Sequence, residues 1–297
     1  MRIKEPFSRQ AFTAVNYCFL SLVALSCIFP ILHILALSLS SNQAAMAGQV
    51  VLFPVDFSLA AYKYLIIKRD FFAAVYISFW RVLAGLGVNM LFIVITAYPL
   101  SKSVLDFPYR TVYIVFFAIT MFIGGGLIPT YMVIKNMGLL NNFWVLILPG
   151  AVNIWSVIIM MNFMRSSIPQ AIEEAAAVDG AGHWRTLFMV VLPMSGPSLA
   201  SLGLFTMIGH WNAWFDGMFY MNNPNNYPMA TYLATQIMSN NQNMTNMTPE
   251  QLAQLVLLSE RTVRAAQLFI SIIPILVIYP FLQRFFVKGI VVGSVKG

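Results

Sequence analysis

The residues best suited to chemistry end a long apolar run, in the sequence His210-Trp211-Asn212-Ala213-Trp214-Phe215-Asp216. Aromatic faces stack on sugar rings, and amide and carboxylate groups hydrogen-bond to hydroxyls, so this composition suits a carbohydrate passage. A belt of aromatic side chains at a membrane surface is the alternative, because Trp is enriched there. His210 and Asn212 favour the passage, since such a belt does not need them. Asn89 and Asn153 are weaker candidates, because hydrogen bonding between helices explains them as well.

Other kinds of chemistry have no signature in this chain. There is no G-x-x-x-x-G-K-[ST] loop for ATP, since the glycine run 124–126 is followed by Leu127. No His-Glu-x-x-His spacing is present, and no metal site is expected. The three histidines lie in separate segments, at His33, His183 and His210. The chain is therefore not expected to be an enzyme.

Composition places the chain in a lipid bilayer. Hydrophobic residues make up 59% of the 297 residues and charged residues 9%, with a mean hydropathy of +0.77. A soluble domain carries about 25% charged residues, so this chain has too few charges to cover a surface that faces water. The net charge of +7 is not gathered in a basic patch, which argues against nucleic acid as a partner. We expect one membrane domain over residues 1–297.

Six apolar segments are long enough to cross the bilayer, which takes about 20 residues of helix. They are Ala11–Leu39, Phe79–Leu100, Thr111–Ile134, Phe143–Met164, Leu187–Phe215 and Ala265–Phe286. Backbone polar groups must be paired within lipid, so each segment is expected to be helical. The sequence therefore predicts an all-α, polytopic membrane protein with six transmembrane helices.

The basic residues indicate which way the chain is inserted. With both termini in the cytoplasm, ten of the seventeen Lys and Arg residues fall on the cytoplasmic side, where these residues are enriched. Arg81 is then assigned to the outer side. Two long outer segments follow, Ser40–Ser78 and the Asn-rich Asp216–Arg264. Within the second, Thr248 and Gln251 predict the start of a short outer helix.

The cytoplasmic segment 167–185 has the pattern of a short helix with an acidic start. Ser167 and Gln170 predict a capping box, with Ser167 as the N-cap. Glu173 and Glu174 lie near the N-terminal end, where negative charge suits the helix dipole.

The same helix has one small apolar face and a glycine-rich end. Ala171, Ala175 and Val178 recur at i, i+4 and i+7, and Gly180 and Gly182 are expected to end the helix in a sharp turn. Such a helix can dock into a groove on a partner. The alternative is a helix that rests on lipid, but those helices usually carry Lys and Arg on the polar face, whereas this one carries acids.

Residues 174–193 resemble the EAA loop of bacterial ABC importer permeases, whose pattern is E-A-A-x3-G-x9-I-x-L-P. This chain has Glu174-Ala175-Ala176, Gly180, Val190 in place of Ile, and Leu192-Pro193. In that family the loop is a cytoplasmic coupling helix that docks into the ATPase subunit. The resemblance implies that Glu174 meets basic residues of the ATPase and that Gly180 permits the turn. It places further residues in the docking segment, namely Ala175, Ala176, Asp179 and Gly182.

The whole chain is similar to the carbohydrate-uptake group of these permeases, which contains the maltose-type subunits. The six spans, the Trp-Asn pair in the fifth span and the basic tail fit that group. The tail Phe286–Gly297 is similar to a subgroup associated with oligo- or polysaccharide fragments, including uronate-containing ones. The resemblance implies a second permease, two ATPase subunits that use ATP and Mg, and an extracytoplasmic solute-binding protein. It implies no cofactor for this chain, and contacts with the binding protein are expected at Asn225, Asn226, Tyr227 and Asn240.

The implied mechanism is alternating access across the bacterial cytoplasmic membrane. Pro193 and Pro197 predict a kink in the fifth span, of a kind that suits such movements. A secondary transporter is the rival from another class, but it typically carries carboxylates at mid-membrane, and Asp216 lies at the end of its span. An ABC permease for a non-carbohydrate solute is the milder alternative.

Overall fold

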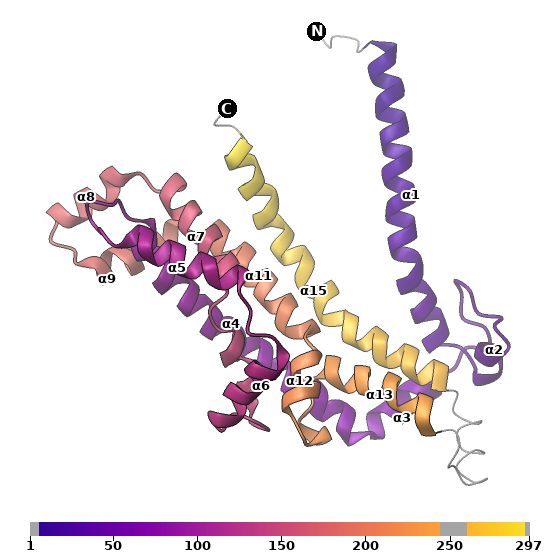
Figure 1. The fold of residues 1–297 in the computed structure, drawn as a ribbon. Helices are drawn as coiled ribbons and strands as arrows, with labels where there is room; N and C mark the ends of the chain where they lie inside the picture. The colour runs from indigo at the N-terminus through magenta and orange to yellow at the C-terminus, as the bar shows by residue number, and fades with distance from the viewer. Residues whose placement is uncertain (1–5, 244–259, 295–297) are drawn as a thin grey trace. The chain divides into compact units, whose positions relative to one another are not determined.

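The chain consists of helices joined by turns and loops in the part that the computed structural model describes, residues 6–243 and 260–294 (Figure 1). No strand occurs within these residues, which confirms the predicted all-α class. The chain divides into two compact units, one made of Met1–Arg69 with Ser239–Pro274 and the other of Asp70–Met238 with Ile275–Gly297.

The first unit is built on a long hydrophobic helix, α1 (Phe7–Ser38), which begins four residues before the expected span. It is followed by α2 (Asn42–Met46) and α3 (Ala60–Ile67). The Ser38 hydroxyl lies 2.8 Å from the Tyr62 hydroxyl, which links the end of α1 to α3. The last helix, α15 (Glu260–Ser294), begins in this unit, and the start of the expected outer helix, at Thr248, lies outside the described residues.

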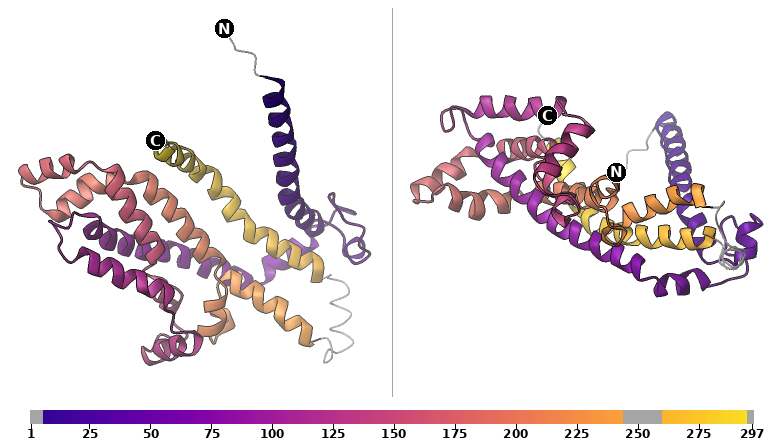
Figure 2. Two further views of the ribbon diagram at one scale, coloured as in Figure 1. Left: turned by 45° about the horizontal axis from the view of Figure 1, so that its top comes forward. Right: turned by 60° about the horizontal axis from the view of Figure 1, so that its bottom comes forward.

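The second unit holds α4 (Arg69–Ser101) and a series of shorter helices. These are α5 (Arg110–Phe122), α6 (Leu127–Asn136), η1 (Phe143–Leu146), η2 (Leu148–Gly150), α7 (Ile154–Ser167), α8 (Gln170–Val178), α9 (His183–Thr186), a π-helical turn (Leu187–Val191), α10 (Leu192–Met194), α11 (Gly196–Asn212), α12 (Phe215–Tyr220), η4 (Pro224–Asn226) and α13 (Met229–Asn243). Figures 1 and 2 show α8 and α9 together at one end of this unit, well away from α12.

The core of this unit lies where α4, α7 and α11 meet. Ile93 and Ala97 of α4, Met160 of α7 and Leu202 of α11 are buried in one apolar cluster with Val191 of the π-helical turn. Close packing of this kind fixes the three helices against one another. The helix α4 therefore forms a firm support for the elements at both of its ends.

Three helices are long and apolar enough to cross a membrane, and three bent helix pairs could each form one further span. The straight candidates among the described residues are Phe7–Ser38, Arg69–Ser101 and Arg261–Ile278. The expected spans at 111–134, 143–164 and 187–215 are the bent pairs, with bends of 114°, 51° and 82°. The apolar runs thus coincide with helical segments, but half of those segments are broken.

Glycine and proline account for the breaks. The first falls at the glycine run 124–126, where Gly126 has a φ of +81°, a conformation that other residues adopt only with strain. The second contains Pro149 and ends where Asn153 caps α7 by accepting a bond from the Ser156 N–H at 3.0 Å. The third lies at Ser195 between Pro193 and Pro197, as the kink prediction required.

Candidate functional site

The N-cap of α8 lies two residues later than the one that the sequence predicts. Ser167 is the last residue of α7, and the N-cap of α8 is Pro169, with no side-chain cap. The prediction that Ser167 caps this helix is therefore wrong, because the buried Ile168 separates the two helices and Ser167 continues the first. The Gln170 amide instead donates to the Glu174 carboxylate at 2.8 Å, one turn along α8.

The apolar face of α8 is uncovered. No residue of this helix is buried, and Ala171, Ala175 and Val178 are all exposed, Val178 to 88%. Exposed apolar side chains in a row on a short helix indicate a surface that a partner covers. The small apolar face that the sequence predicts is thus present and exposed, and its docking to a partner stays a prediction.

The end of α8 has the geometry expected from Gly180. Its φ is +79°, its N–H bonds to the Ala177 carbonyl at 3.0 Å, and the Ala181 N–H bonds to the Ala176 carbonyl at 2.9 Å. This is a Schellman motif with Asp179 as the C-cap, and it needs glycine at its left-handed position. Gly182 has a φ of −72° and begins α9, so its role differs from the one that the sequence suggested.

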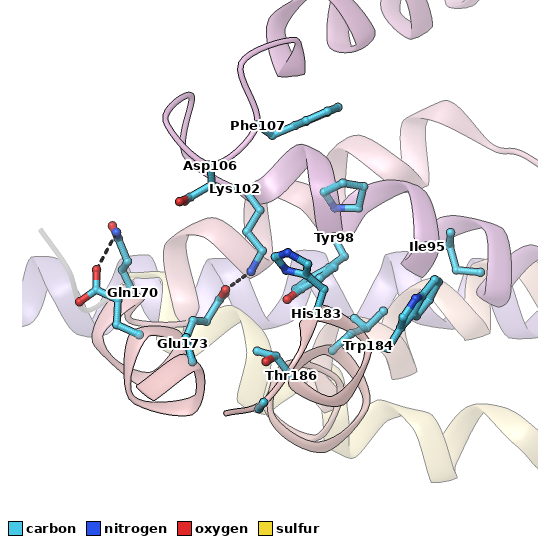
Figure 3. A pocket seen from close by; sticks show the side chains of 15 residues that line it. Ile95, Tyr98, Lys102, Asp106, Phe107, Gln170, Glu173, His183, Trp184 and Thr186 are labelled. Carbon is cyan, nitrogen blue, oxygen red and sulfur yellow. Dashed lines mark hydrogen bonds and ion pairs between the residues drawn. The ribbon is translucent and has the colours of Figure 1, made fainter. Parts of the chain in front are cut away.

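An ion pair joins α8 to the end of α4. Glu173 pairs with Lys102, the residue after α4, and the Lys102 Nζ lies 3.9 Å from the centre of the Tyr98 ring. Both side chains are less than a quarter exposed. They line a cavity of about 550 Å³ between α4, the loop at Asp106 and the segment α8–α9 (Figure 3). Burial lowers the pKa of Lys102 to about 8, although the charge of Asp106 acts in the opposite direction.

At the other end of the unit, a second ion pair organises the break between α11 and α12. Arg81 of α4 is only 1% exposed, donates to the Ala213 carbonyl at 2.9 Å and pairs with Asp216. The Thr231 hydroxyl donates to the Trp214 carbonyl at 2.8 Å. The Ala213 carbonyl at the C-cap of α11 is therefore held by a side chain, while the Trp214 carbonyl also accepts from the Met218 N–H at 3.1 Å.

His210 belongs to the same scaffold. Its Nε2 lies 3.1 Å from the Asn89 Oδ1, and the Asn89 amide donates to the Gly150 carbonyl at 2.9 Å. The His210 ring lies so close to Gly85 that a Cβ at that position would overlap it. His210 and Asp216 thus hold helices together. The contacts of Asn89 are likewise hydrogen bonds between helices, which is the alternative role considered for it.

The remaining pathway candidates lie on the outside of the unit. Asn212, Trp214 and Phe215 are exposed, whereas Trp211 is half-buried. Phe215 stacks on Phe219 with their ring centres 4.3 Å apart. An aromatic and amide surface is therefore available beside the break, and Asn153, although it caps α7, is also exposed.

The outer-loop candidates are partly fixed in place. Asn225 is exposed, while Asn226 and Tyr227 are half-buried, and Tyr227 packs on a buried cluster of α6, η1 and α12. The Asn141 side chain holds the start of this loop by accepting from the Asn222 and Asn223 N–H groups at 3.2 and 3.3 Å. Asn240 lies in α13, and its side chain is outside the described part. Contacts with a binding protein stay a prediction for all four.

Sequence reasoning missed the roles that three residues have in these sites. Arg81 was assigned to an outer segment, yet it lies within α4 and is buried. The sequence does contain a signal for the ion pair of Arg81. A single cation beside a long apolar run needs a partner, and Asp216 is the acid at the end of another such run. Lys102 and Glu173 had no such signal, since 71 residues separate them in sequence.

Comparison with known proteins agrees with this arrangement. Residues 89–292 match the family model described as the binding-protein-dependent transport system inner membrane component. The polygalacturonan/rhamnogalacturonan transport system permease protein YtcP of Bacillus subtilis is 33% identical over 96% of this chain and 98% of its own length. Protein LplC of the same organism is 34% identical over 97% of this chain and 96% of its own.

A solved structure is also similar over almost the whole chain. It comes from a bacterial ABC transporter involved in the import of the acidic polysaccharide alginate. The TM-score is 0.86 and the identity 31%, over 96% of this chain and 99% of that one. Sequence, fold and the α8 segment agree: the chain belongs to the family of inner-membrane components of binding-protein-dependent transport systems and is a transport subunit rather than an enzyme.

Proposed function

We propose that this chain is one of two permease subunits of an ATP-driven importer that carries oligosaccharides, including uronate-containing ones, across the bacterial cytoplasmic membrane. The observation that carries the proposal is α8. Its Ala face is exposed, Glu173 and Glu174 lie near its start, and Gly180 fixes its end. A helix with these features suits a groove on a separate ATPase subunit.

The cargo is proposed from the relatives and from the exposed residues beside α12. The Bacillus permease is named for polygalacturonan and rhamnogalacturonan, and the solved transporter imports alginate. These polymers contain uronic acids. Asn212, Trp214 and Phe215 offer the amide and aromatic groups that bind sugars. This supports a sugar passage on that face of the subunit.

The partners and the orientation follow from the same role. The complex would contain a second permease, two ATPase subunits that bind ATP and Mg, and a solute-binding protein outside the membrane that contacts Asn225, Asn226 and Tyr227. Both termini would be cytoplasmic, because α8 must lie on the side where the ATPase binds. This chain would bind no cofactor of its own.

The proposed mechanism is alternating access. ATP closes the ATPase dimer, the coupling helices of the two permeases move together, and the passage turns outward towards the loaded binding protein. Hydrolysis returns it to the inward state. The broken helices at residues 122–127 and at Ser195 suit such movement, because a broken span can change its angle at the break.

The test is uptake of labelled sugars into proteoliposomes that contain the complete complex. The panel should include neutral oligosaccharides, oligogalacturonates and oligomers of alginate, each offered with the binding protein. We expect ATP-dependent uptake of at least one uronate oligomer. Uptake of neutral sugars alone would limit the proposal to carbohydrate, and uptake of no sugar by an intact, ATP-hydrolysing complex would overturn the cargo.

A further inference from the structure

The helix α8 packs only loosely against the rest of its own subunit. None of its residues is buried, and its apolar face is exposed. Glu173 and Ala176 are only partly exposed, and Glu173 is turned towards α4, where its carboxylate pairs with Lys102. Among the described residues, this is the ion pair that connects α8 with a long helix of the same unit.

The surroundings of Lys102 strengthen this contact. The side chains of Lys102 and Glu173 are 15% and 24% exposed, so water screens them less than it screens a pair on an open surface. The Lys102 Nζ also lies over the Tyr98 ring, at 3.9 Å from its centre. Asp106 and His183 line the same cavity, and the Asp106 carboxylate accepts from the Ser103 hydroxyl at 2.8 Å (Figure 3). Lys102 thus makes two contacts in this cavity, the ion pair with Glu173 and the cation–π contact with Tyr98.

The helix α4 continues from this contact to the other end of the unit. Its 33 residues correspond to a length of about 50 Å. Asn89 in its middle bonds to His210, and Arg81 in its first half pairs with Asp216. One helix is therefore tied to α8 at its C-terminal end and to the break beside Trp214 from within its first half.

We propose that Lys102 and Glu173 tie the coupling helix to α4, so that a movement of α8 is passed along α4 to the break between α11 and α12. The inference rests on the proposed coupling role of α8, and it assigns Glu173 a task different from that of Glu174. Glu174 serves the contact with the ATPase, while Glu173 faces inward and positions α8 on its own subunit. Both are positioning residues, and neither touches the cargo.

Charge exchange tests this tie. In proteoliposomes with the complete complex, sugar taken up per ATP hydrolysed is compared for wild type, Lys102→Glu, Glu173→Lys and the double exchange. We expect each single change to lower this ratio about fivefold, the lower end of typical coupling energies. The double exchange should recover most of it. Lys135→Gln, which removes an exposed lysine of α6, is the matched control and should keep the wild-type ratio.

A covalent link tests the same point without relying on charge. Cysteines replace Lys102 and Glu173 in a chain whose Cys18 and Cys27 are changed to serine, and a short bismaleimide joins them. The linked protein should retain the uptake ratio and the unlinked one should lose it. Equal ratios in both, or a double exchange that stays as low as the single changes in an assembled complex, would overturn the tie. A wild-type complex that shows no ATP-dependent uptake would instead refute the proposed function itself.

Discussion

Arg81 and Asp216 form an ion pair between α4 and α12 although 135 residues separate them in sequence. Arg81 also donates to the Ala213 carbonyl, the C-cap of α11. One buried guanidinium thus fixes both sides of the break that presents Trp214.

Loss of both partners of this pair should destabilise the subunit by less than the sum of the two single losses. Asp216→Asn leaves the Arg81 cation buried without its counter-charge, which typically costs about 3–5 kcal/mol. The double change Arg81→Gln with Asp216→Asn should cost less than the sum of the single changes. The melting temperatures of the purified complexes, taken at one heating rate, provide the comparison. Strictly additive losses would show that the two residues do not interact.

The contact between Gly85 and His210 predicts that position 85 of α4 tolerates no side chain. Gly85→Ala places a Cβ inside the His210 ring, and overpacking of this kind costs about 1–3 kcal/mol. Gly87→Ala is the matched control, because nothing lies within 4 Å of a Cβ there. The yield of folded, monodisperse protein and its melting temperature should fall for the first variant only. Restoration by the added change His210→Ala would assign the loss to this contact.

The backbone at the end of α8 predicts that Gly180 and Gly182 differ in how well they tolerate replacement by alanine. Gly180→Ala forces a side chain into a left-handed conformation, at a cost of about 1–2 kcal/mol, and should weaken binding of the ATPase subunit. Gly182→Ala should be the milder change, because Gly182 has a φ of −72° and open space around it. Co-purification of the ATPase with each variant measures this. Equal losses would mean that the end of α8 changes its conformation on docking.

The pKa of Lys102 predicts that coupling weakens at alkaline pH. Burial lowers this pKa from 10.5 to about 8, so the ammonium is charged below that pH and loses its proton as the pH rises through it. The ion pair with Glu173 is then lost at high pH and kept at low pH. Uptake per ATP should fall between about pH 7 and about pH 9 in wild type. Lys102→Arg, which stays charged over this range, should show the smaller fall, and parallel curves would contradict the account.

The sequence predicted the helical class and the position of α8, because apolar runs and the EAA pattern are local signals. Gly180 illustrates this, because a glycine that follows a short helical pattern already predicts the end of the helix. The breaks were harder to predict: the glycine run 124–126 lies inside an apolar run that is long enough for a straight span. Pairs such as Lys102 with Glu173 depend on how distant helices pack, and local pattern does not contain that information. The environments of His210 and Asn212 diverge for the same reason: these residues are two positions apart in sequence, yet His210 is partly buried between helices and Asn212 is exposed.

The central claim is that α8 couples an ATPase to this permease, and the most direct test is ATP hydrolysis by the complete complex with its sugar-loaded binding protein. Wild type should be stimulated. In Glu174→Ala this stimulation should be at least about tenfold smaller. The change removes one partner of the charge pair proposed between Glu174 and the ATPase, and such a loss in a buried pair costs about 2 kcal/mol or more. Glu174→Gln, which keeps the side-chain length, separates charge from packing. Full stimulation of Glu174→Ala in an intact complex would contradict the account.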